Sequence, residues 1–179
     1  MATLLAADIG GTKSELAIFE IAAQSYTPLA RKRYVNRHFS SLTDVITSFL
    51  SEVDTLPRYG SIGVAGIVAG RKAKLTNLPW QVECHDLEQQ FGFEEVVLVN
   101  DLTAMCSGIS LLGPGDLIEL QKGAAAAQNE VKGVIAPGTG LGQGFMIETA
   151  GHFFARGSEG GHVDFGPVNE GQVALLSWM

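Results

Sequence analysis

A short stretch near the end of the sequence carries the residues best suited to chemistry. Residues 159–165 read Glu-Gly-Gly-His-Val-Asp-Phe, so two carboxylates and one imidazole flank a pair of glycines. A buried strand disfavours adjacent glycines, because glycine packs no side chain and loses the most backbone entropy on ordering. We interpret the stretch as backbone folded closely around a small polar ligand, with Glu159 and His162 bonding adjacent hydroxyl groups of a sugar. A purely structural role for His162 is the alternative.

A glycine-rich loop near the start of the chain is a candidate phosphate site. Asp8 ends an apolar run and is followed, after one residue, by Gly10, Gly11, Thr12 and Lys13. Successive main-chain amides in such a turn can bind phosphate oxygens, and Asp8 could hold a magnesium ion through water. The loop lacks the spacing of a Walker A motif, and a simple glycine hairpin is the alternative.

A second glycine-rich loop contains Gly138, Thr139, Gly140 and Gly142. The residues after it resemble a strand, whereas a dinucleotide-binding loop must open a helix. The pattern therefore favours a second phosphate cradle over dinucleotide binding, and a flexible hairpin is the alternative.

An acid stands where a predicted strand gives way to a predicted helix, at Asn100 and Asp101. A carboxylate at this position could act as a general base that accepts a proton from a substrate hydroxyl during phosphoryl transfer. Aspartate is also a good helix N-cap, so capping alone is the competing interpretation.

Composition limits the remaining possibilities. The 179 residues carry a net charge of −7, which argues against nucleic acid or an anionic membrane as a partner. Two cysteines offer neither a disulfide framework nor metal-site spacing, which is typical of a reducing cytoplasm. No apolar run approaches the ~20 residues of a membrane span, and no signal peptide is visible at the start. The apolar helix-like run at the end, residues 173–179, is uncapped and reads as cut short.

The motifs must be positioned by predicted strands and helices. These alternate along the chain, and this order predicts a mixed α/β fold. A capping box over residues 41–44 predicts a helix behind it, Asp86 is expected to cap a short helix ending at Phe91, and residues 113–115 are the best linker. The predicted strands cover residues 4–9, 14–21, 29–35, 61–65, 71–75, 95–99, 117–120, 131–136 and 144–149, the first three forming a meander.

The order and spacing of five motifs resemble bacterial glucokinase. That family belongs to the actin-like sugar kinases, which have a ribonuclease-H-like core. The resemblance covers essentially the whole chain, and its most specific motif is the stretch at residues 159–165. The motifs are Asp8–Lys13, Thr76–Asn77, Val99–Asp101, Gly138–Gly142 and Glu159–Phe165.

The resemblance implies a fold, a reaction and a set of site residues. It implies an actin-like α/β lobe with a mixed sheet over residues 1–112 and the start of a larger α+β lobe over residues 113–179. A cytoplasmic enzyme, which is a homodimer in the family, would phosphorylate glucose on its 6-hydroxyl with ATP and magnesium. By resemblance, Asp101 is the catalytic base; Asn77, Asn100, Asp101, Gly140, Glu159 and His162 bind the sugar; Gly10, Gly11, Thr12, Lys13, Gly138 and Thr139 bind nucleotide phosphates; and Asp8 binds magnesium through water.

Two other functions fit parts of the pattern. A sugar-sensing module without catalysis would use the sugar contacts alone, and another actin-like ATPase would use only the phosphate loops. By resemblance the adenosine-binding segment lies beyond Met179, so we expect this chain by itself to be a poor kinase. Ser158 stands where many family members have glycine, which changes backbone freedom but no ligand group.

Overall fold

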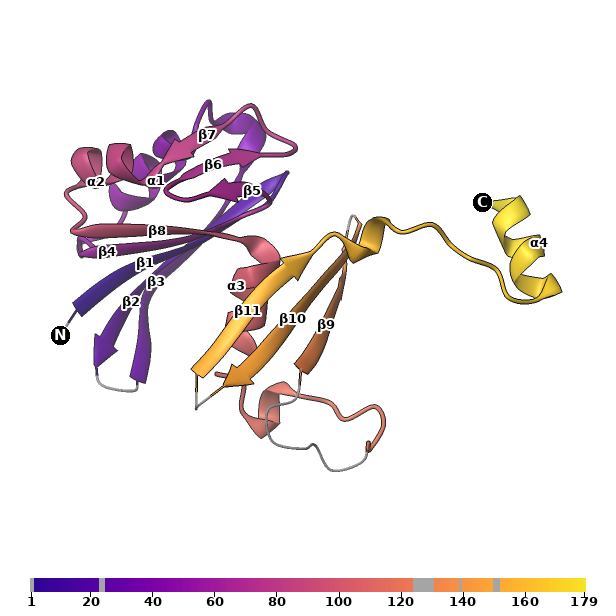
Figure 1. The fold of residues 1–179 in the computed structure, drawn as a ribbon. Helices are drawn as coiled ribbons and strands as arrows, with labels where there is room; N and C mark the ends of the chain where they lie inside the picture. Colours follow the sequence, from indigo (N-terminus) through magenta and orange to yellow (C-terminus); the bar gives the residue numbers. More distant parts are fainter. Residues whose placement is uncertain (1, 23–24, 124–130, 139, 150–151) are drawn as a thin grey trace.

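A five-stranded sheet forms the centre of the first part of the chain. The computed structural model describes residues 2–22, 25–123, 131–138, 140–149 and 152–179. The strands lie in the order β3-β2-β1-β4-β8 (Figure 1), with β1 to β3 antiparallel and β4 and β8 parallel to β1. This mixed α/β sheet confirms the predicted fold class and the opening meander. The strands are β1 (Ala2–Ile9), β2 (Lys13–Ala22), β3 (Ser25–Val35), β4 (Tyr59–Val64) and β8 (Glu95–Asn100).

One face of this sheet is buried beneath two helices, α1 (Leu42–Leu50) and α2 (Cys84–Phe91). Side chains alternate along a strand, so Leu5, Ala7 and Ile9 of β1 enter the core, and Leu5 and Ile9 are fully buried. Helix α1 begins as predicted, since the Ser41 hydroxyl accepts a hydrogen bond from the Asp44 amide at 3.1 Å.

A small antiparallel sheet closes the same core at one end. It consists of β5 (Gly66–Ala69), β6 (Lys72–Leu75) and β7 (Gln81–Glu83), in that order. Trp80 and Val82 are each 4 % exposed and pack into the common core. This sheet therefore fixes the loop from residue 76 to residue 79, which carries Asn77.

A second three-stranded sheet lies on the other side of α3 (Asp101–Ile109), as Figure 1 shows. Its order is β11-β10-β9, and both pairs are antiparallel. Helix α3 packs against β10 and β11, and Cys106 and Met146 are buried between them. The strands are β9 (Val131–Pro137), β10 (Leu141–Thr149) and β11 (His152–Ser158).

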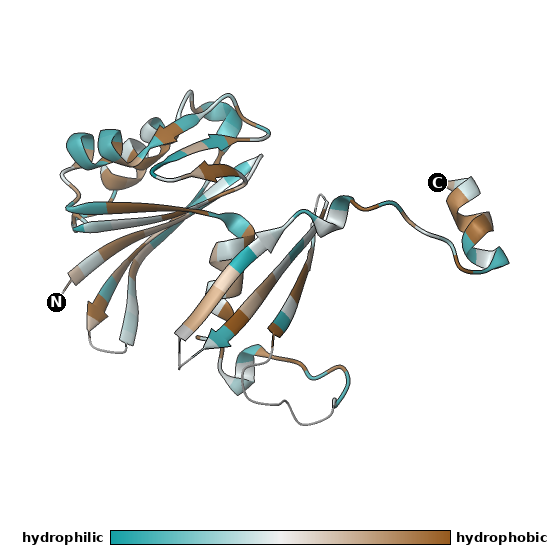
Figure 2. Cartoon of the chain, in the orientation of Figure 1, coloured by the Kyte–Doolittle hydropathy of each residue, from teal (hydrophilic) through white to brown (hydrophobic). Residues whose placement is uncertain are grey.

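The last helix, α4 (Glu170–Trp178), stands apart from both sheets in Figure 1 and buries none of its residues. Figure 2 shows brown, hydrophobic residues along this helix, and Val173, Leu175 and Leu176 are all exposed. Short 3₁₀ turns, η1 (Asn36–His38), η2 (Pro114–Asp116) and η3 (Gly160–His162), complete the chain. None of the helices in the ranges given above is long and apolar enough to cross a membrane.

Two local predictions were wrong. Residues 117–120 form no strand; their apolar side chains are exposed, and within the described ranges no strand pairs with them. Helix α2 begins earlier than expected, with Glu83 at the N-cap position, so Asp86 lies in its first turn instead of capping it. An acid there still complements the positive end of the helix dipole. Residues 124–127, an alanine run whose low complexity predicts a loop between the strands expected at 117–120 and 131–136, lie outside the described residues.

Candidate functional site

The first glycine loop is a tight hairpin between β1 and β2. The Gly10 amide donates to the Lys13 carbonyl oxygen at 3.0 Å, which closes the turn. Among the described residues, the amides of Gly11 and Thr12 donate no hydrogen bond. Two adjacent free amides at a strand end are suited to an anion such as a phosphate.

A buried asparagine that the sequence did not single out holds this loop in place. The Asn36 side chain is 1 % exposed, and its Nδ2 donates to the Gly10 carbonyl oxygen at 2.8 Å. Its Oδ1 accepts from the Ser14 hydroxyl at 2.7 Å, and its main-chain amide donates to the Thr12 carbonyl oxygen at 3.0 Å. No sequence motif marks Asn36, because its importance comes only from this pairing across the sheet.

Asn77 lies against the same loop. A Cβ atom added to Gly11 would be 3.1 Å from the Cβ of Asn77 and 3.2 Å from its Nδ2. The Thr76 amide donates to the Ala65 carbonyl oxygen at 3.1 Å, and so ties this segment to the end of β4. The structure therefore brings Asn77, predicted as a sugar ligand, next to a predicted phosphate loop.

Asp8 sits in a row of charged residues that crosses three strands. It is paired with Glu15 of β2, which is paired in turn with Arg33 of β3. Partial burial raises the pKa of the Asp8 carboxyl, and the negative charges of Asp101 and Glu15 raise that pKa further. Hydrogen bonds from Arg33 and Arg31 lower the pKa of Glu15. Asp8 makes no ion pair within the described ranges, and Arg33 only partly offsets the rise in its pKa.

Asp101 reaches the same end of the sheet from the first turn of α3. A Cβ atom on Gly63 of β4 would be 4.0 Å from the Asp101 Cα, and Gly63 is the partner of Asp8 across β1 and β4. The absence of a side chain at Gly63 lets the helix start close to the sheet. Two predicted acidic site residues, Asp8 and Asp101, therefore flank one glycine.

Asn100, and not Asp101, is the N-cap of α3. Its Oδ1 accepts hydrogen bonds from the amides of Leu102 at 3.1 Å and Thr103 at 3.3 Å. Its Nδ2 is 3.4 Å from the Gly66 carbonyl oxygen, a long bond. Asp101 Oδ1 accepts only from the Leu102 amide, at 2.8 Å. The capping interpretation of Asp101 is thus largely wrong, and its second carboxylate oxygen makes no hydrogen bond to the described residues.

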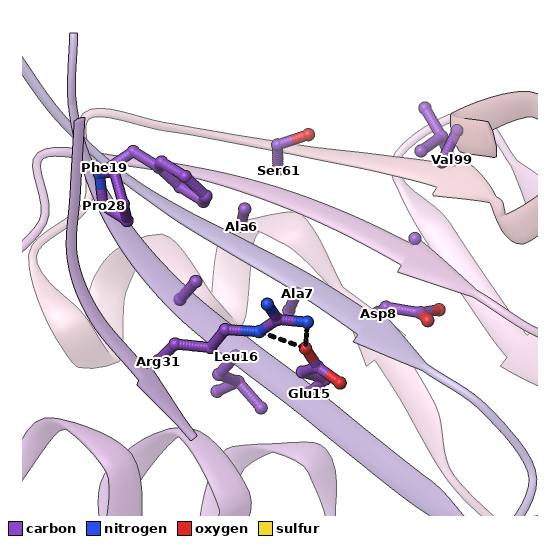
Figure 3. A pocket seen from close by; sticks show the side chains of 13 residues that line it. Ala6, Ala7, Asp8, Glu15, Leu16, Phe19, Pro28, Arg31, Ser61 and Val99 are labelled. Carbon is purple, nitrogen blue, oxygen red and sulfur yellow. Dashed lines mark hydrogen bonds and ion pairs between the residues drawn. The ribbon is translucent and has the colours of Figure 1, made fainter. Parts of the chain in front are cut away.

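The uncovered face of the five-stranded sheet encloses an open cavity of about 630 Å³. Figure 3 shows Asp8 and Glu15 on this face, with Arg31 hydrogen-bonded to Glu15. Small side chains such as Ala6 and Ser61 form its floor. Asp8 and Glu15 are the two acids that line this cavity. The other candidate site residues are not part of its lining, so the cavity borders the candidate site.

The second glycine loop is a hairpin between β9 and β10. The Gly138 amide donates to the Gly140 carbonyl oxygen at 2.8 Å, while Thr139 lies outside the described residues. Strand β10 begins at Leu141, so the loop ends before Gly142, the last glycine of the predicted motif.

This hairpin contacts the Glu159 stretch directly. A Cβ atom on Gly161 would fall 1.7 Å from the Leu141 carbonyl oxygen, and one on Gly160 would fall 2.4 Å from Gln143 Oε1. Those distances leave no room for any other residue type at Gly161 without a backbone shift. Close packing is therefore one physical reason for the adjacent glycines.

Glu159 and His162 lie on one side of the η3 turn and contact each other. His162 Nδ1 is 3.1 Å from Glu159 Oε2, and the two side chains are 83 % and 92 % exposed. A carboxylate and an imidazole so disposed can accept and donate hydrogen bonds to adjacent sugar hydroxyls.

The predicted site residues thus form two groups. Asp8, the first glycine loop, Asn77, Asn100 and Asp101 gather at one end of the five-stranded sheet. Glu159 and His162 join the second glycine loop at the start of β10 and the end of β11. No hydrogen bond or ion pair within the described ranges connects Asp101 with Glu159 or His162.

One carboxylate, that of Asp8, is available to a cation beside the first glycine loop. Among the described residues, no three His, Cys, Asp or Glu side chains are close enough together to hold a metal. Magnesium usually keeps several waters and takes one or two carboxylates together with substrate phosphates. Asp8, with its raised pKa and its acidic neighbours, fits one such carboxylate beside a phosphate loop.

Comparison with known proteins gives one consistent family. A family model described as Glucokinase matches residues 5–179. A curated glucokinase from Nostoc punctiforme is 38 % identical over 181 residues, which cover 100 % of this chain and 53 % of that protein. The chain therefore spans about half the length of the curated relatives it matches.

Solved structures agree with the fold. A crystal structure of glucokinase from an Antarctic psychrotroph superposes with a TM-score of 0.83 at 27 % identity, covering 99 % of this chain and 56 % of that one. A Balamuthia mandrillaris glucokinase in complex with glucose gives a TM-score of 0.68 at 22 % identity, covering 98 % and 53 %. The second match supports the fold only, because its sequence identity is low.

Proposed function

Because this chain belongs to the glucokinase family, we propose that the complete protein phosphorylates glucose on its 6-hydroxyl at the expense of ATP. The observation that supports this most directly is the position of Asp101. Asp101 begins α3 with its Cα beside Gly63, and its negative charge acts on Asp8, which precedes the loop of Gly10 to Lys13. An acid near a phosphate-binding loop can accept the proton of a hydroxyl group that attacks the phosphate.

Asp101 is the general base of the proposed reaction. It accepts the proton of the 6-hydroxyl as that oxygen forms a bond to the γ-phosphorus, and the bond from phosphorus to the bridging oxygen of ADP breaks. Asn100 takes over the capping of α3, which leaves one Asp101 oxygen available for the hydroxyl. The free amides of Gly11 and Thr12 stabilise charge on the phosphates.

Asp8 would hold the magnesium ion through water, next to the first phosphate loop. When bound, magnesium neutralises phosphate charge. The loop of Gly138 and Thr139 would contact phosphate from the second sheet. These assignments rest on the resemblance and on the geometry of the loops.

The sugar would lie between the two groups of site residues. Glu159 and His162 would bond neighbouring hydroxyls, and Asn100 Nδ2 can turn to a sugar oxygen because its bond to Gly66 is long. Asn77 and the main chain at Gly140 would complete the contacts. Discrimination of glucose from mannose or fructose would depend on these side chains.

The larger assembly follows the family pattern. We propose that residues 1–112 form one lobe and that residues 113–179 begin the other, with the sugar in the cleft between them. Closure over the sugar would exclude water and limit ATP hydrolysis. A cytoplasmic homodimer is the arrangement we propose for the complete protein.

An Asp101→Asn variant of the complete protein tests the function. Asparagine keeps the shape of the side chain but cannot accept the proton, so glucose-dependent ADP release should fall by about 100-fold or more. Glucose affinity, measured by calorimetry, should change only a few-fold. A variant that retains activity within tenfold would show that Asp101 is not the base.

The matched control is Asp54→Asn, at an exposed acid in the turn after α1. It should leave ADP release unchanged. Calorimetry on the parent protein separates the alternatives, since heat from glucose without any turnover would indicate a sugar sensor, and heat from ATP without a response to sugar would indicate another actin-like ATPase.

A further inference from the structure

One side-chain contact joins the two groups of site residues. The Gly157 amide of β11 donates a hydrogen bond to the Thr103 hydroxyl of α3, and the donor–acceptor distance is 3.1 Å. Thr103 lies two residues after Asp101, and Gly157 lies two residues before Glu159. The bond therefore lies within two residues of both the proposed base, Asp101, and the proposed sugar ligand, Glu159.

The position of β11 explains why this amide needs a side-chain partner. Strand β11 pairs only with β10, so it forms an edge of its sheet within the described ranges. An edge strand has main-chain amides with no neighbouring strand to accept their hydrogen bonds. The Thr103 hydroxyl supplies the acceptor at Gly157 and so attaches α3 to this edge.

The packing around the bond is unusually close. A Cβ atom on Gly157 would be 2.8 Å from Asn100 Oδ1 and 3.5 Å from the Leu102 Cβ. A Cβ atom on Gly142 would be 2.9 Å from Leu102 Cδ2, and one on Gly144 would be 2.7 Å from Cys106 Sγ. Glycines in both strands thus let α3 seat directly on the main chain of β10 and β11.

We propose that Thr103 is a positioning residue, which holds the end of β11 against the start of α3 and so sets Glu159 relative to Asp101. The inference rests on the proposed glucose phosphorylation. The Thr103 hydroxyl bonds Gly157 and contacts neither substrate in this proposal. Asp101 accepts the proton, and Glu159 binds the sugar. Misplacement of a sugar ligand by a fraction of a bond length is enough to slow such a reaction.

Thr103→Val in the complete protein removes the acceptor and keeps the branched shape. It should lower kcat/KM for glucose about tenfold, mainly through a higher KM for glucose, while KM for ATP stays within twofold. Thr103→Ser keeps the hydroxyl and should restore kcat/KM to within about threefold. The control is Thr47→Val, because the Thr47 hydroxyl bonds only the Thr43 carbonyl oxygen inside α1.

Three results would overturn the proposal. The first is a Thr103→Val enzyme with an unchanged KM for glucose and only a lower melting temperature, which would mark a merely structural role. The second is failure of Thr103→Ser to restore activity. The third comes from amide hydrogen exchange, which needs no turnover: Gly157 and Glu159 should exchange faster in Thr103→Val than in the parent and Thr103→Ser. Equal exchange rates would refute the proposed role of the hydrogen bond between Thr103 and Gly157. Failure of the parent protein to phosphorylate glucose would instead refute only the proposed function.

Discussion

The side-chain amide of Asn36 donates to the main-chain carbonyl oxygen of Gly10 at 2.8 Å, from a position that is almost wholly buried. All the polar groups of that side chain are satisfied by the turn between β1 and β2, since Ser14 completes the set. A buried polar side chain is stable only when its hydrogen bonds are made. The shape of the first glycine loop is therefore stabilised from η1, outside the loop itself.

Ser14→Ala should disturb this loop without altering its glycines. The substitution leaves Asn36 Oδ1 buried without its 2.7 Å partner, which costs about 1–3 kcal/mol. We expect KM for ATP to rise several-fold, while glucose affinity is little changed. Kinetics with each substrate varied separately give the measurement. The control is Ser25→Ala, whose exposed hydroxyl bonds only the Ala22 carbonyl oxygen; an equal rise in both KM values for Ser14→Ala would contradict the assignment.

Glu15→Gln should lower stability in a pH-dependent way. Hydrogen bonds from Arg33 and Arg31 hold the pKa of Glu15 below its ordinary 4.5, so the ionised form stabilises the folded chain. That contribution is present above pH 4.5 and is lost as the pH falls through the lowered pKa. We expect a melting temperature about 2–4 °C lower at pH 7, with the difference narrowing below pH 4.5.

Thermal unfolding of parent and Glu15→Gln from pH 7 down to acid pH makes this comparison. Glu119→Gln, at an exposed position in the segment before β9, is the control and should behave like the parent at every pH. A pH-independent difference between Glu15→Gln and the parent would mean that the ion pairs do not carry the effect.

The elements with local signals were predicted well from the sequence. Strands β1 and β2 are largely apolar, and α1 has both an apolar stripe and the Ser41 cap. Strands β5, β7 and β11 were not predicted. A strand of three or four residues such as β7 carries no periodicity of its own and forms because β6 offers it hydrogen bonds. The apolar residues 117–120 show the converse, since no described strand pairs with them.

The candidate site shows the same division between residues that have a local sequence signal and residues that have none. Glycine pairs and acids at strand ends are visible in the sequence, and Asp8 and Asp101 do come together beside Gly63. Residues that support them are not visible, because Asn36 and Thr103 are ordinary polar residues until the fold places an unpaired main-chain group beside each. Local patterns thus single out candidate ligand groups but not the residues that position them.

Ser41→Ala should weaken the fold and leave catalysis unchanged. The Ser41 hydroxyl accepts from the Asp44 amide, and loss of such an N-cap costs about 1 kcal/mol. The melting temperature should fall by about 2–4 °C, with both KM values unaltered because α1 lies on the face of the sheet away from α3. Calorimetric unfolding and steady-state kinetics test the two halves of this statement. Ser51→Ala, at the other end of α1, is the comparison, and a change in KM for Ser41→Ala would link α1 to the site.

Gly161→Ala should damage the sugar site more than the fold. The new Cβ atom would start 1.7 Å from the Leu141 carbonyl oxygen, so the η3 turn must move away from β10 and carry Glu159 and His162 with it. Neither atom belongs to a flexible side-chain end, which makes the displacement one of the main chain. We expect glucose affinity to fall by more than about tenfold, because the two ligands lose their common position.

Calorimetric titration of the complete protein with glucose measures this effect, and Gly166→Ala is the matched control. A Cβ atom on Gly166 meets no atom within 4 Å, so the same glycine-to-alanine change near η3 should leave the affinity unaltered. Binding of ATP to Gly161→Ala should fall less than glucose binding, because the first phosphate loop belongs to the other sheet and only the second proposed phosphate loop adjoins Leu141. Unchanged glucose affinity in Gly161→Ala would mean that the sugar does not depend on the η3 turn, and the roles proposed for Glu159 and His162 would then be wrong.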